Sequence, residues 1–230
     1  MYKKQIRNKI LNTFEEAEWL KSESELEKKM KFVIIGGGGH GLATAYYLAK
    51  EHNITNVAII EKGWIGGGNV GRNTTIIRSN YMYDDNALFS EFGMDLWRRM
   101  SQDLNYNVMF SPRGIINLAH SDAQMNIFTR RGNSMRLNGI DAVLLNREEV
   151  KKIIPMADFS ENVRFPIFGG LMQPSAGTAR HDAVAWGYAR QADSMGVDII
   201  QNCEVTGFEF VVGKLLLKFP LKFVDTGDLS

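Results

Sequence analysis

Apolar and polar positions divide the chain into a charged opening segment and a longer region with regular patterns. Residues 1–30 alternate lysine and glutamate, and Ile6, Ile10 and Phe14 recur at a spacing that lines one side of a helix. From residue 31 the charged pattern gives way to short apolar runs separated by glycines. We interpret the opening segment as a charged N-terminal extension, either a solvated helix or a frayed end. The alternative is an arm that docks a partner subunit.

The first patterned region predicts a βαβ unit. Residues 32–35 form a continuous apolar run rich in β-branched side chains, which is typical of a strand buried on both faces. Glycines follow, and residues 42–50, in which small alanines recur, predict a close-packed helix. Residues 57–60 predict a second buried strand, which Glu61 closes. Strand, glycine turn, helix and strand within about thirty residues are the parts of a βαβ unit.

The rest of the chain predicts further helices and strands after a glycine- and asparagine-rich loop at residues 63–74. Helical spacing occurs at 84–100, 121–138, 147–154 and 182–195, and strand-like runs occur at 113–118, 168–173 and 197–210. Helices that alternate with strands in this way predict an α/β fold.

Composition excludes several classes of protein. The 27 Lys and Arg residues balance 26 Asp and Glu residues for a net charge of +1, so we expect no nucleic-acid or membrane partner. Cys203 is the single cysteine, which excludes an intrachain disulfide framework and a cysteine-rich metal site, and we expect no metal. One cysteine fits a reducing compartment, and no run approaches the roughly 20 apolar residues of a spanning helix. With no pattern of an export signal, we expect a cytoplasmic protein.

The strongest motif is the glycine run at residues 36–41, which satisfies G-x-G-x-x-G. Gly36 permits the tight turn out of the strand, and Gly38 lets a pyrophosphate approach the backbone. Gly41 lets the helix pack closely on the sheet. The start of the helix then offers N–H groups and the positive end of its dipole to phosphate charge.

An acid in the right place strengthens this motif. Glu61 follows Gly41 by twenty residues and ends the second predicted strand, where its carboxylate can accept hydrogen bonds from both ribose hydroxyls of an adenosine. A carboxylate there repels a ribose 2′-phosphate, which argues against NADP. The alternative is a glycine-rich turn beside an unrelated surface glutamate.

The glycine loop does not decide between NAD and FAD, but the residues after Glu61 favour FAD. Residues 63–75 supply small, amide and hydroxyl side chains suited to a buried pyrophosphate and flavin. Arg78, after two isoleucines, is placed to face the flavin or an anionic substrate, and it is our candidate for a catalytic role. The alternative to a contact with the flavin or substrate is that these side chains only form hydrogen bonds within the loop. This alternative concerns Asn69, Arg72, Asn73, Thr74 and Arg78.

Two stretches resemble a known family. Residues 34–81 (IIGGGGHGLATAYYLAKEHNITNVAIIEKGWIGGGNVGRNTTIIRSNY) and 169–207 (GGLMQPSAGTARHDAVAWGYARQADSMGVDIIQNCEVTG) are similar to the beta subunits of heterotetrameric sarcosine oxidase. These belong to the D-amino-acid-oxidase-like flavoenzyme superfamily. The similarity covers about residues 32–210, and its more specific parts are His40 and the segment around His181.

The resemblance implies two flavins. In that family an FMN is attached covalently to a histidine of the beta subunit, and the motif match assigns it to His181. A neutral imidazole nitrogen is a competent nucleophile towards the flavin 8α position, and Arg180 adds positive charge beside it. An isolated histidine is otherwise more often structural. The contacts to noncovalent FAD carry over to Gly39, His40, Glu61, Asn69, Thr74 and the main chain of Val205, in an expected strand at 204–206.

The implied reaction is oxidation of the C–N bond of sarcosine (N-methylglycine) to glycine and a one-carbon unit. Electrons pass from FAD to FMN and then to O2, with H2O2 formed, and tetrahydrofolate captures the one-carbon unit in a complex with alpha, gamma and delta subunits. A related dimethylglycine or sarcosine dehydrogenase, which passes electrons to a carrier, is the first alternative. A noncatalytic flavin-binding fragment is the second.

We therefore expect a Rossmann-like FAD-binding domain at residues 31–100 and 162–210, with the start of a mixed β-sheet substrate domain at 101–161. Residues 211–230 depart from the family, and we interpret this tail as the end of a fragment or an incorrect reading frame rather than a divergent strand. The family's beta subunits continue well beyond this length. We therefore expect the isolated chain to be inactive and its catalytic residues, Arg78 apart, to lie in the C-terminal part that this chain lacks.

Overall fold

The structure, a computed structural model, describes residues 32–160, 162–211 and 214–218. The predicted extension at residues 1–30 lies outside them. The described residues form two compact units: one contains those up to Gly71 and from Tyr188 onwards, and the other contains those from Arg72 to Gly187. The units divide the chain at different residues from the predicted domains, since the segment from 72 to 187 stays together.

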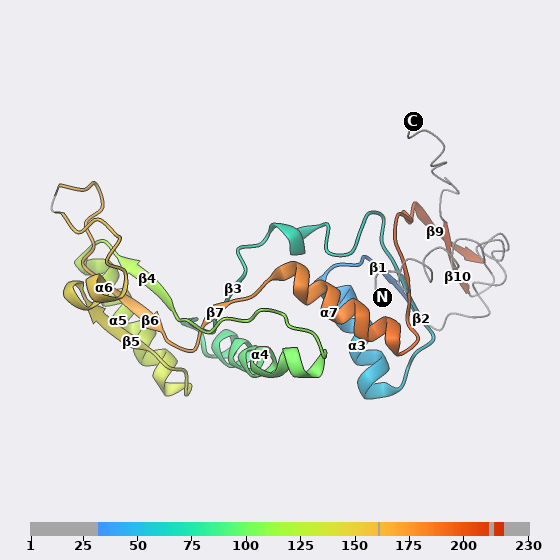
Figure 1. Ribbon diagram of the computed structural model, residues 1–230, viewed down its shortest axis with the longest axis horizontal. Helices are drawn as coiled ribbons and strands as arrows, with labels where there is room; N and C mark the ends of the chain where they lie inside the picture. Colours follow the sequence, from blue (N-terminus) through green and yellow to red (C-terminus); the bar gives the residue numbers. More distant parts are fainter. Residues whose placement is uncertain (1–31, 161, 212–213, 219–230) are drawn as a thin grey trace. The chain divides into compact units, whose positions relative to one another are not determined.

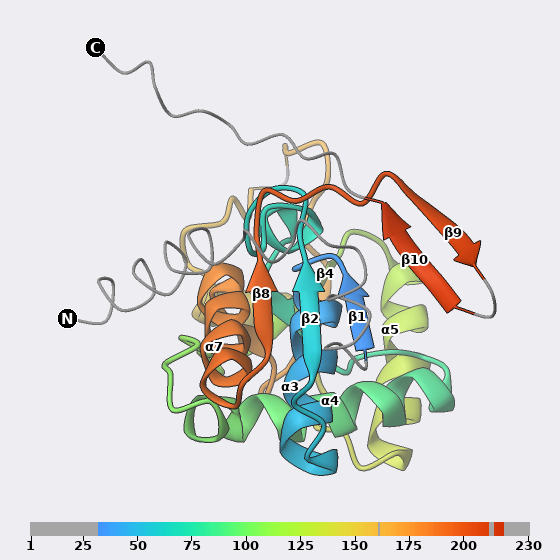
Figure 2. The same cartoon turned by 90° about the vertical axis from the view of Figure 1, so that its right-hand side faces the viewer.

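The first unit is built on a three-stranded parallel sheet in the order β1-β2-β8 (Figure 2). The connection between the first two strands is a helix, as a parallel pair requires. The elements are β1 (Phe32–Ile35), α3 (Gly39–His52), β2 (Val57–Ile60) and β8 (Asp198–Ile200). The predicted βαβ unit is therefore present.

Burial differs between the strands of this sheet. All four residues of β2 are buried, because β2 has a neighbour on each side. Phe32 and Ile35 of β1 are 41% and 51% exposed, so the expectation that β1 is buried on both faces was wrong. Among the described strands β1 pairs with β2 alone, so it is an edge strand of this sheet.

Helix α3 packs through a stripe of small and apolar side chains. Leu42, Ala45, Tyr46 and Ala49 are buried, a spacing that lies on one side of an α-helix. Asn53 ends the helix in the left-handed conformation at φ 52°, which asparagine adopts more readily than most residues. The alanines predicted to allow close packing are therefore part of the buried face.

The second unit contains an antiparallel sheet in the order β4-β6-β5, with α5 and α6 beside it (Figure 1). A buried cluster that includes Met135 and Leu171 joins α5 to this sheet, and Leu145, Val150 and Ile167 form another. The elements are β4 (Ile115–Ala119), α5 (Asp122–Leu137), β5 (Val143–Asn146), α6 (Arg147–Ile153) and β6 (Gly169–Gln173).

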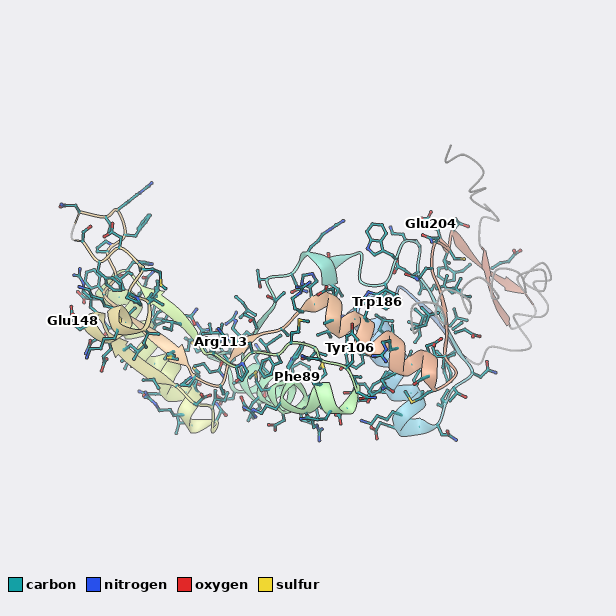
Figure 3. All side chains as sticks on the ribbon, viewed as in Figure 1. Phe89, Tyr106, Arg113, Glu148, Trp186 and Glu204 are labelled. Atoms are coloured by element: carbon teal, nitrogen blue, oxygen red, sulfur yellow. The ribbon has the colours of Figure 1, made fainter. Side chains whose placement is uncertain are left out.

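Two further parts complete this unit. The short strands β3 (Ile76–Ile77) and β7 (Gly177–Thr178) pair antiparallel. Helix α4 (Asp84–Asp103) is amphipathic as predicted, with buried Met94 and with Phe89 79% exposed (Figure 3). Helix α7 (His181–Ser194) spans the boundary between the two units.

The C-terminal part of the described chain differs from the expectation in two ways. Residues 201–206 form no strand, so the predicted strand around Val205 was wrong. Beyond it, β9 (Gly207–Val211) pairs antiparallel with β10 (Lys214–Lys218), which falls in the predicted divergent tail. The rest of that tail, from residue 219, lies outside the described residues. None of the described helices has both the length and the apolar character needed to cross a membrane.

Candidate functional site

The glycine loop between β1 and α3 has the geometry that its motif predicts. Gly36 has φ +108°, a conformation that side-chain-bearing residues rarely adopt, and its N–H donates to the carbonyl of Ile60 at 2.8 Å. A Cβ added to Gly41 would stand 2.1 Å from the carbonyl oxygen of Gly36. The first glycine therefore makes the turn and the last permits the close packing of α3 on that turn.

The start of α3 is open to an anion. The N-cap residue is Gly38, which has no side chain to cap the helix, and the first turn contains no acid. A Cβ built on Gly38 would meet its nearest heavy atom, Cγ2 of Val70, only at 4.0 Å. The N–H groups and positive dipole end of this helix can therefore be approached closely by phosphate oxygens.

Glu61 turns its carboxylate towards the glycine loop. Oε2 accepts a hydrogen bond from the N–H of Gly37 at 2.7 Å, and Oε1 accepts one from the N–H of Gly63 at 2.8 Å. Each carboxylate oxygen has two lone pairs, so both retain capacity for a ligand hydroxyl. The half-buried acid at the tip of β2 is thus fixed beside the phosphate-binding turn.

These features fit the adenosine and pyrophosphate of a dinucleotide. Phosphate charge is matched by the helix start, close approach is allowed at Gly38, and hydroxyl groups have a fixed acceptor in Glu61. The structure brings together Gly36, Gly38, Gly39, Gly41 and Glu61 in the first unit.

The other predicted contacts are more scattered. His40 is exposed on α3, Asn69 is exposed in a short 3-10 helix, Asn69–Arg72, and Val205 is partly exposed after β8. Arg72, Thr74, Arg78 and His181 belong to the second unit. Asn73 accepts a hydrogen bond through Oδ1 from the N–H of Thr75 at 2.7 Å, which is the local role considered as its alternative.

His181 is the first residue of α7, and its Nδ1 atom is buried. Nδ1 has no hydrogen-bond partner within the described structure. Buried polar side-chain atoms are nearly always paired, so an orphaned ring nitrogen points to a partner that the described residues do not supply. This nitrogen is compatible with attachment of a prosthetic group.

The charge next to His181 is compensated. Arg180 donates two hydrogen bonds to the carboxylate of Asp182, at 2.9 and 2.7 Å. The hydrogen bond from Arg180 holds the pKa of Asp182 below its usual value. The positive charge that the sequence places beside the histidine is therefore largely neutralised by its neighbour.

The chain leading to His181 is held by main-chain pairing. Thr178 exchanges hydrogen bonds with Ser111, at 2.7 and 3.1 Å, and the N–H of Ala179 donates to the carbonyl of Thr75 at 3.1 Å. Thr75 itself has φ +59°, a strained conformation for a β-branched residue. The histidine therefore follows a segment whose position is fixed from both sides.

Arg78 forms part of a polar cluster that the sequence did not predict. Its guanidinium donates to Oδ1 of Asn80 and lies 5.0 Å from the centre of the Tyr81 ring. Arg131, from α5, donates through Nε to the carbonyl of Asn80 at 2.6 Å. Asn80 is buried and donates to Oδ1 of Asn117 at 2.6 Å.

This cluster concentrates positive charge. Burial lowers the pKa of Arg131, and the nearby charge of Arg78 lowers it further. Neither guanidinium forms an ion pair with a carboxylate of the described residues. Two guanidinium groups that meet at one buried asparagine without an acid can bind a carboxylate or another small anion.

Comparison with known proteins decides the family. A family model described as FAD dependent oxidoreductase matches residues 31–217. The chain belongs to the FAD-dependent oxidoreductase family. The match includes the glycine loop, Glu61 and His181, and it continues into β10, beyond the residue at which we expected the resemblance to stop. The predicted α/β, Rossmann-like FAD-binding fold is confirmed.

Among curated relatives of this FAD-dependent oxidoreductase, the beta subunit of sarcosine oxidase from Rhizobium meliloti (strain 1021) is 64% identical over 184 residues, which are 80% of this chain and 44% of that protein. The corresponding subunit from an Arthrobacter species is 52% identical over 84% of this chain and 48% of its own length. The chain thus spans about half the length of the curated relatives it matches.

Solved structures agree on the fold. L-proline dehydrogenase from P. horikoshii superposes with a TM-score of 0.71 at 28% identity, over 81% of this chain and 48% of that protein. Glycine oxidase from Geobacillus kaustophilus superposes with a TM-score of 0.72 at 20% identity, over 82% of this chain and 50% of that protein. The second likeness concerns the fold alone.

Proposed function

We propose that this chain supplies the FAD-binding part of an enzyme that oxidises the C–N bond of sarcosine. The observation that carries the proposal is the carboxylate of Glu61, held at the glycine loop by hydrogen bonds from Gly37 and Gly63. Supporting it, the relatives with 64% and 52% identity are named as beta subunits of sarcosine oxidase. The products are glycine and a one-carbon unit.

In this proposal the residues of the first unit bind and orient noncovalent FAD. The uncapped start of α3 receives the pyrophosphate, and Gly38 allows its close approach. Glu61 accepts hydrogen bonds from the ribose hydroxyls, while its existing bonds to the main chain keep it from turning into water. The bound flavin supplies the capacity to accept two electrons from the amine, which no amino-acid side chain here provides.

We propose that His181 carries a covalent FMN. Its buried Nδ1 supports this, because attachment of a group at the imidazole would account for a ring nitrogen that the described residues leave unpaired. The main-chain hydrogen bonds of Thr178 and Ala179 to neighbouring segments would hold the backbone before His181 in place, and with it the position of the imidazole ring. With both flavins bound, they would supply the chemistry that carries electrons from the amine to O2, with H2O2 formed.

We assign the substrate carboxylate to the cluster of Arg78 and Arg131. Sarcosine carries a carboxylate, and these two guanidinium groups meet at Asn80 without an acidic partner among the described residues. A planar guanidinium can bind both carboxylate oxygens, which orients the substrate as well as attracting it. Arg78 is thus proposed to bind substrate through charge rather than to transfer a proton.

The proposal extends to the assembly. A subunit of this type acts beside alpha, gamma and delta subunits in the cytoplasm, and tetrahydrofolate bound to the complex captures the one-carbon unit. The name "subunit beta" of the relatives supports a multisubunit assembly.

The test of the FAD site is a titration of the purified chain with FAD. Glu61→Ala removes the fixed acceptor, and hydrogen bonds to a charged group of this kind predict a dissociation constant about ten- to hundred-fold higher. Glu51→Ala, which removes an exposed acid at the far end of α3, is the matched control. Equal affinity of Glu61→Ala and the unchanged chain would contradict the proposal.

The test of the second flavin uses the chain coexpressed with candidate partner subunits and then denatured. Flavin fluorescence should migrate with this chain on a gel and disappear in His181→Ala, while FAD remains extractable. His120→Ala is the control, since the ring of His120 contacts the main chain at Phe165. Fluorescence that persists in His181→Ala would contradict attachment at His181. Covalent FAD in place of covalent FMN favours a dehydrogenase of the related type. A complex that holds flavin yet is never reduced by an N-methyl amine favours a noncatalytic fragment.

A further inference from the structure

The loop that carries Glu61 is tied to the chain after β8. The N–H of Glu61 donates to the carbonyl of Ile200 at 2.8 Å, and the N–H of Cys203 donates back to the carbonyl of Glu61 at 3.0 Å. The N–H of Asn202 donates to the carbonyl of Gly63 at 2.9 Å. The chain that follows β8 therefore runs beside the end of β2 and pairs with the loop that follows β2.

A side chain adds to this pairing. Oε1 of Gln201 accepts a hydrogen bond from the N–H of Ile65 at 2.8 Å, across 136 residues of sequence. Ile65 is 8% exposed, so its N–H has little access to water if that acceptor is lost. A buried main-chain donor without a partner is unfavourable, and the loop would have to rearrange to satisfy it.

The same loop also reaches the phosphate-binding turn. The N–H of Gly66, next to Ile65, donates to the carbonyl of Gly37 at 3.0 Å, and Gly37 in turn donates to Oε2 of Glu61. Movement of the loop at Ile65 would therefore disturb the hydrogen bond from Gly66 to Gly37. Through Gly37 it would also disturb the hydrogen bond that holds the Glu61 carboxylate. All of these residues belong to the first unit.

We propose that Gln201 is a positioning residue for the FAD site. By holding the N–H of Ile65 it fixes the loop from Glu61 to Gly66, and with it the carboxylate that receives the ribose and the turn that receives the pyrophosphate. This inference rests on the proposed function. It assigns to the end of β8 a side chain that shapes the cofactor site without touching the cofactor.

Two variants of nearly equal length separate the acceptor from the bulk of the side chain. Gln201→Met fills the same space and removes Oε1, whereas Gln201→Glu keeps an oxygen acceptor for the N–H of Ile65. Gln102→Met is the control, because it makes the same exchange of side chains at an exposed position of α4, away from this loop. Each 230-residue chain is titrated with FAD, and amide hydrogen exchange is measured without FAD.

In Gln201→Met we expect faster exchange of the Ile65 amide and a dissociation constant for FAD about three- to ten-fold higher. Gln201→Glu should restore the slow exchange and part of the affinity, and Gln102→Met should change neither by more than about two-fold. A change of bulk alone would not be rescued by Gln201→Glu, so the rescue distinguishes positioning from general packing.

Two results overturn the inference. Unchanged exchange of the Ile65 amide in Gln201→Met shows that the side chain does not hold the loop. Lost protection with unchanged FAD affinity shows that the held loop does not shape the cofactor site. If no chain, including the unchanged one, binds FAD while Ile65 still responds to Gln201, the proposed function fails and the structural tie remains.

Discussion

The N–H of Gly37 donates a 2.7 Å hydrogen bond to Oε2 of Glu61, which joins the glycine loop to the tip of the neighbouring strand across 24 residues of sequence. The bond directs the carboxylate to the place where a nucleotide sugar follows its phosphates in a dinucleotide-binding fold. It also explains why residue 37 is glycine, since an added Cβ would lie 3.1 Å from Cβ of Glu61. The binding geometry and the fold are therefore coupled at this pair.

Alanine at Gly38 and at Gly41 should have different effects. A Cβ at Gly38 stays 4.0 Å from its nearest neighbour, so Gly38→Ala should fold with unchanged stability but bind FAD more than about ten-fold more weakly, because its methyl occupies the approach of the pyrophosphate. Gly41→Ala places its Cβ 2.1 Å from the carbonyl oxygen of Gly36 and should lose about 1–3 kcal/mol of stability or more. Urea unfolding and FAD titration measure the two effects separately.

Gly68→Ala is the control for both variants, since its Cβ would meet no atom within 4 Å. A stable Gly41→Ala chain would mean that α3 does not pack on the turn as described. FAD affinity that is unaffected by Gly38→Ala would place the pyrophosphate elsewhere.

The strand before His181 should not tolerate a side chain at Gly177. A Cβ there would lie 2.0 Å from the carbonyl oxygen of Ser111, the residue that pairs with Thr178. Gly177→Ala should therefore separate these segments, speed hydrogen exchange at Thr178, and lower the midpoint of urea unfolding. Gly93→Ala, in the interior of α4 with no neighbour within 4 Å, should instead raise stability by up to about 1 kcal/mol through helix propensity. Similar behaviour of the two variants would refute this expectation.

The stability of helix α6 should depend on its N-cap residue, Asn146. The side chain of Asn146 accepts from the N–H of Glu149 at 3.0 Å, and the Glu149 carboxylate accepts from the N–H of Asn146 at 2.8 Å, which is a capping box. Asn146→Ala should lower the free energy of unfolding by about 1 kcal/mol. Asn126→Ala, on the exposed side of α5, tests whether loss of an asparagine alone has this effect, and we expect no destabilisation there. Equal losses in both variants would show that the cap is not responsible.

Cys203 should react slowly with thiol reagents. Burial raises the pKa of this thiol, so at pH 8 the folded chain holds less thiolate than an exposed cysteine, whose pKa is about 8.5. Alkylation by iodoacetamide should be slow at pH 8, become faster at more alkaline pH, and accelerate when urea unfolds the chain. Because the folded state keeps this proton to higher pH, the contribution of the thiol to stability is present below the unfolded pKa and falls as the pH rises above it. A native rate equal to that in urea would contradict the burial of Cys203.

Local patterns were sufficient for most of the elements. The apolar run at 57–60 predicted β2, and the spacing at 84–100 predicted α4, because burial on both faces and burial on one face leave different periods in the sequence. β5, at Val143–Asn146, was missed because a strand of four residues with both ends exposed shows no clear alternation of apolar and polar positions. The strand expected around Val205 was wrong because a valine between polar residues does not by itself find a pairing partner.

The sequence by itself determined the βαβ unit, the glycine turn, the acid that follows it and the membership of a flavin-binding family, since each depends on residues that are close together along the chain. Tertiary structure alone decided where the side chains of Glu61 and Gln201 are directed, and that Arg131 meets Arg78 at Asn80. These contacts join residues distant in sequence, and no local pattern encodes them. The pairing of strands and helices brings such residues within hydrogen-bonding distance, and that pairing minimises the free energy of the whole chain.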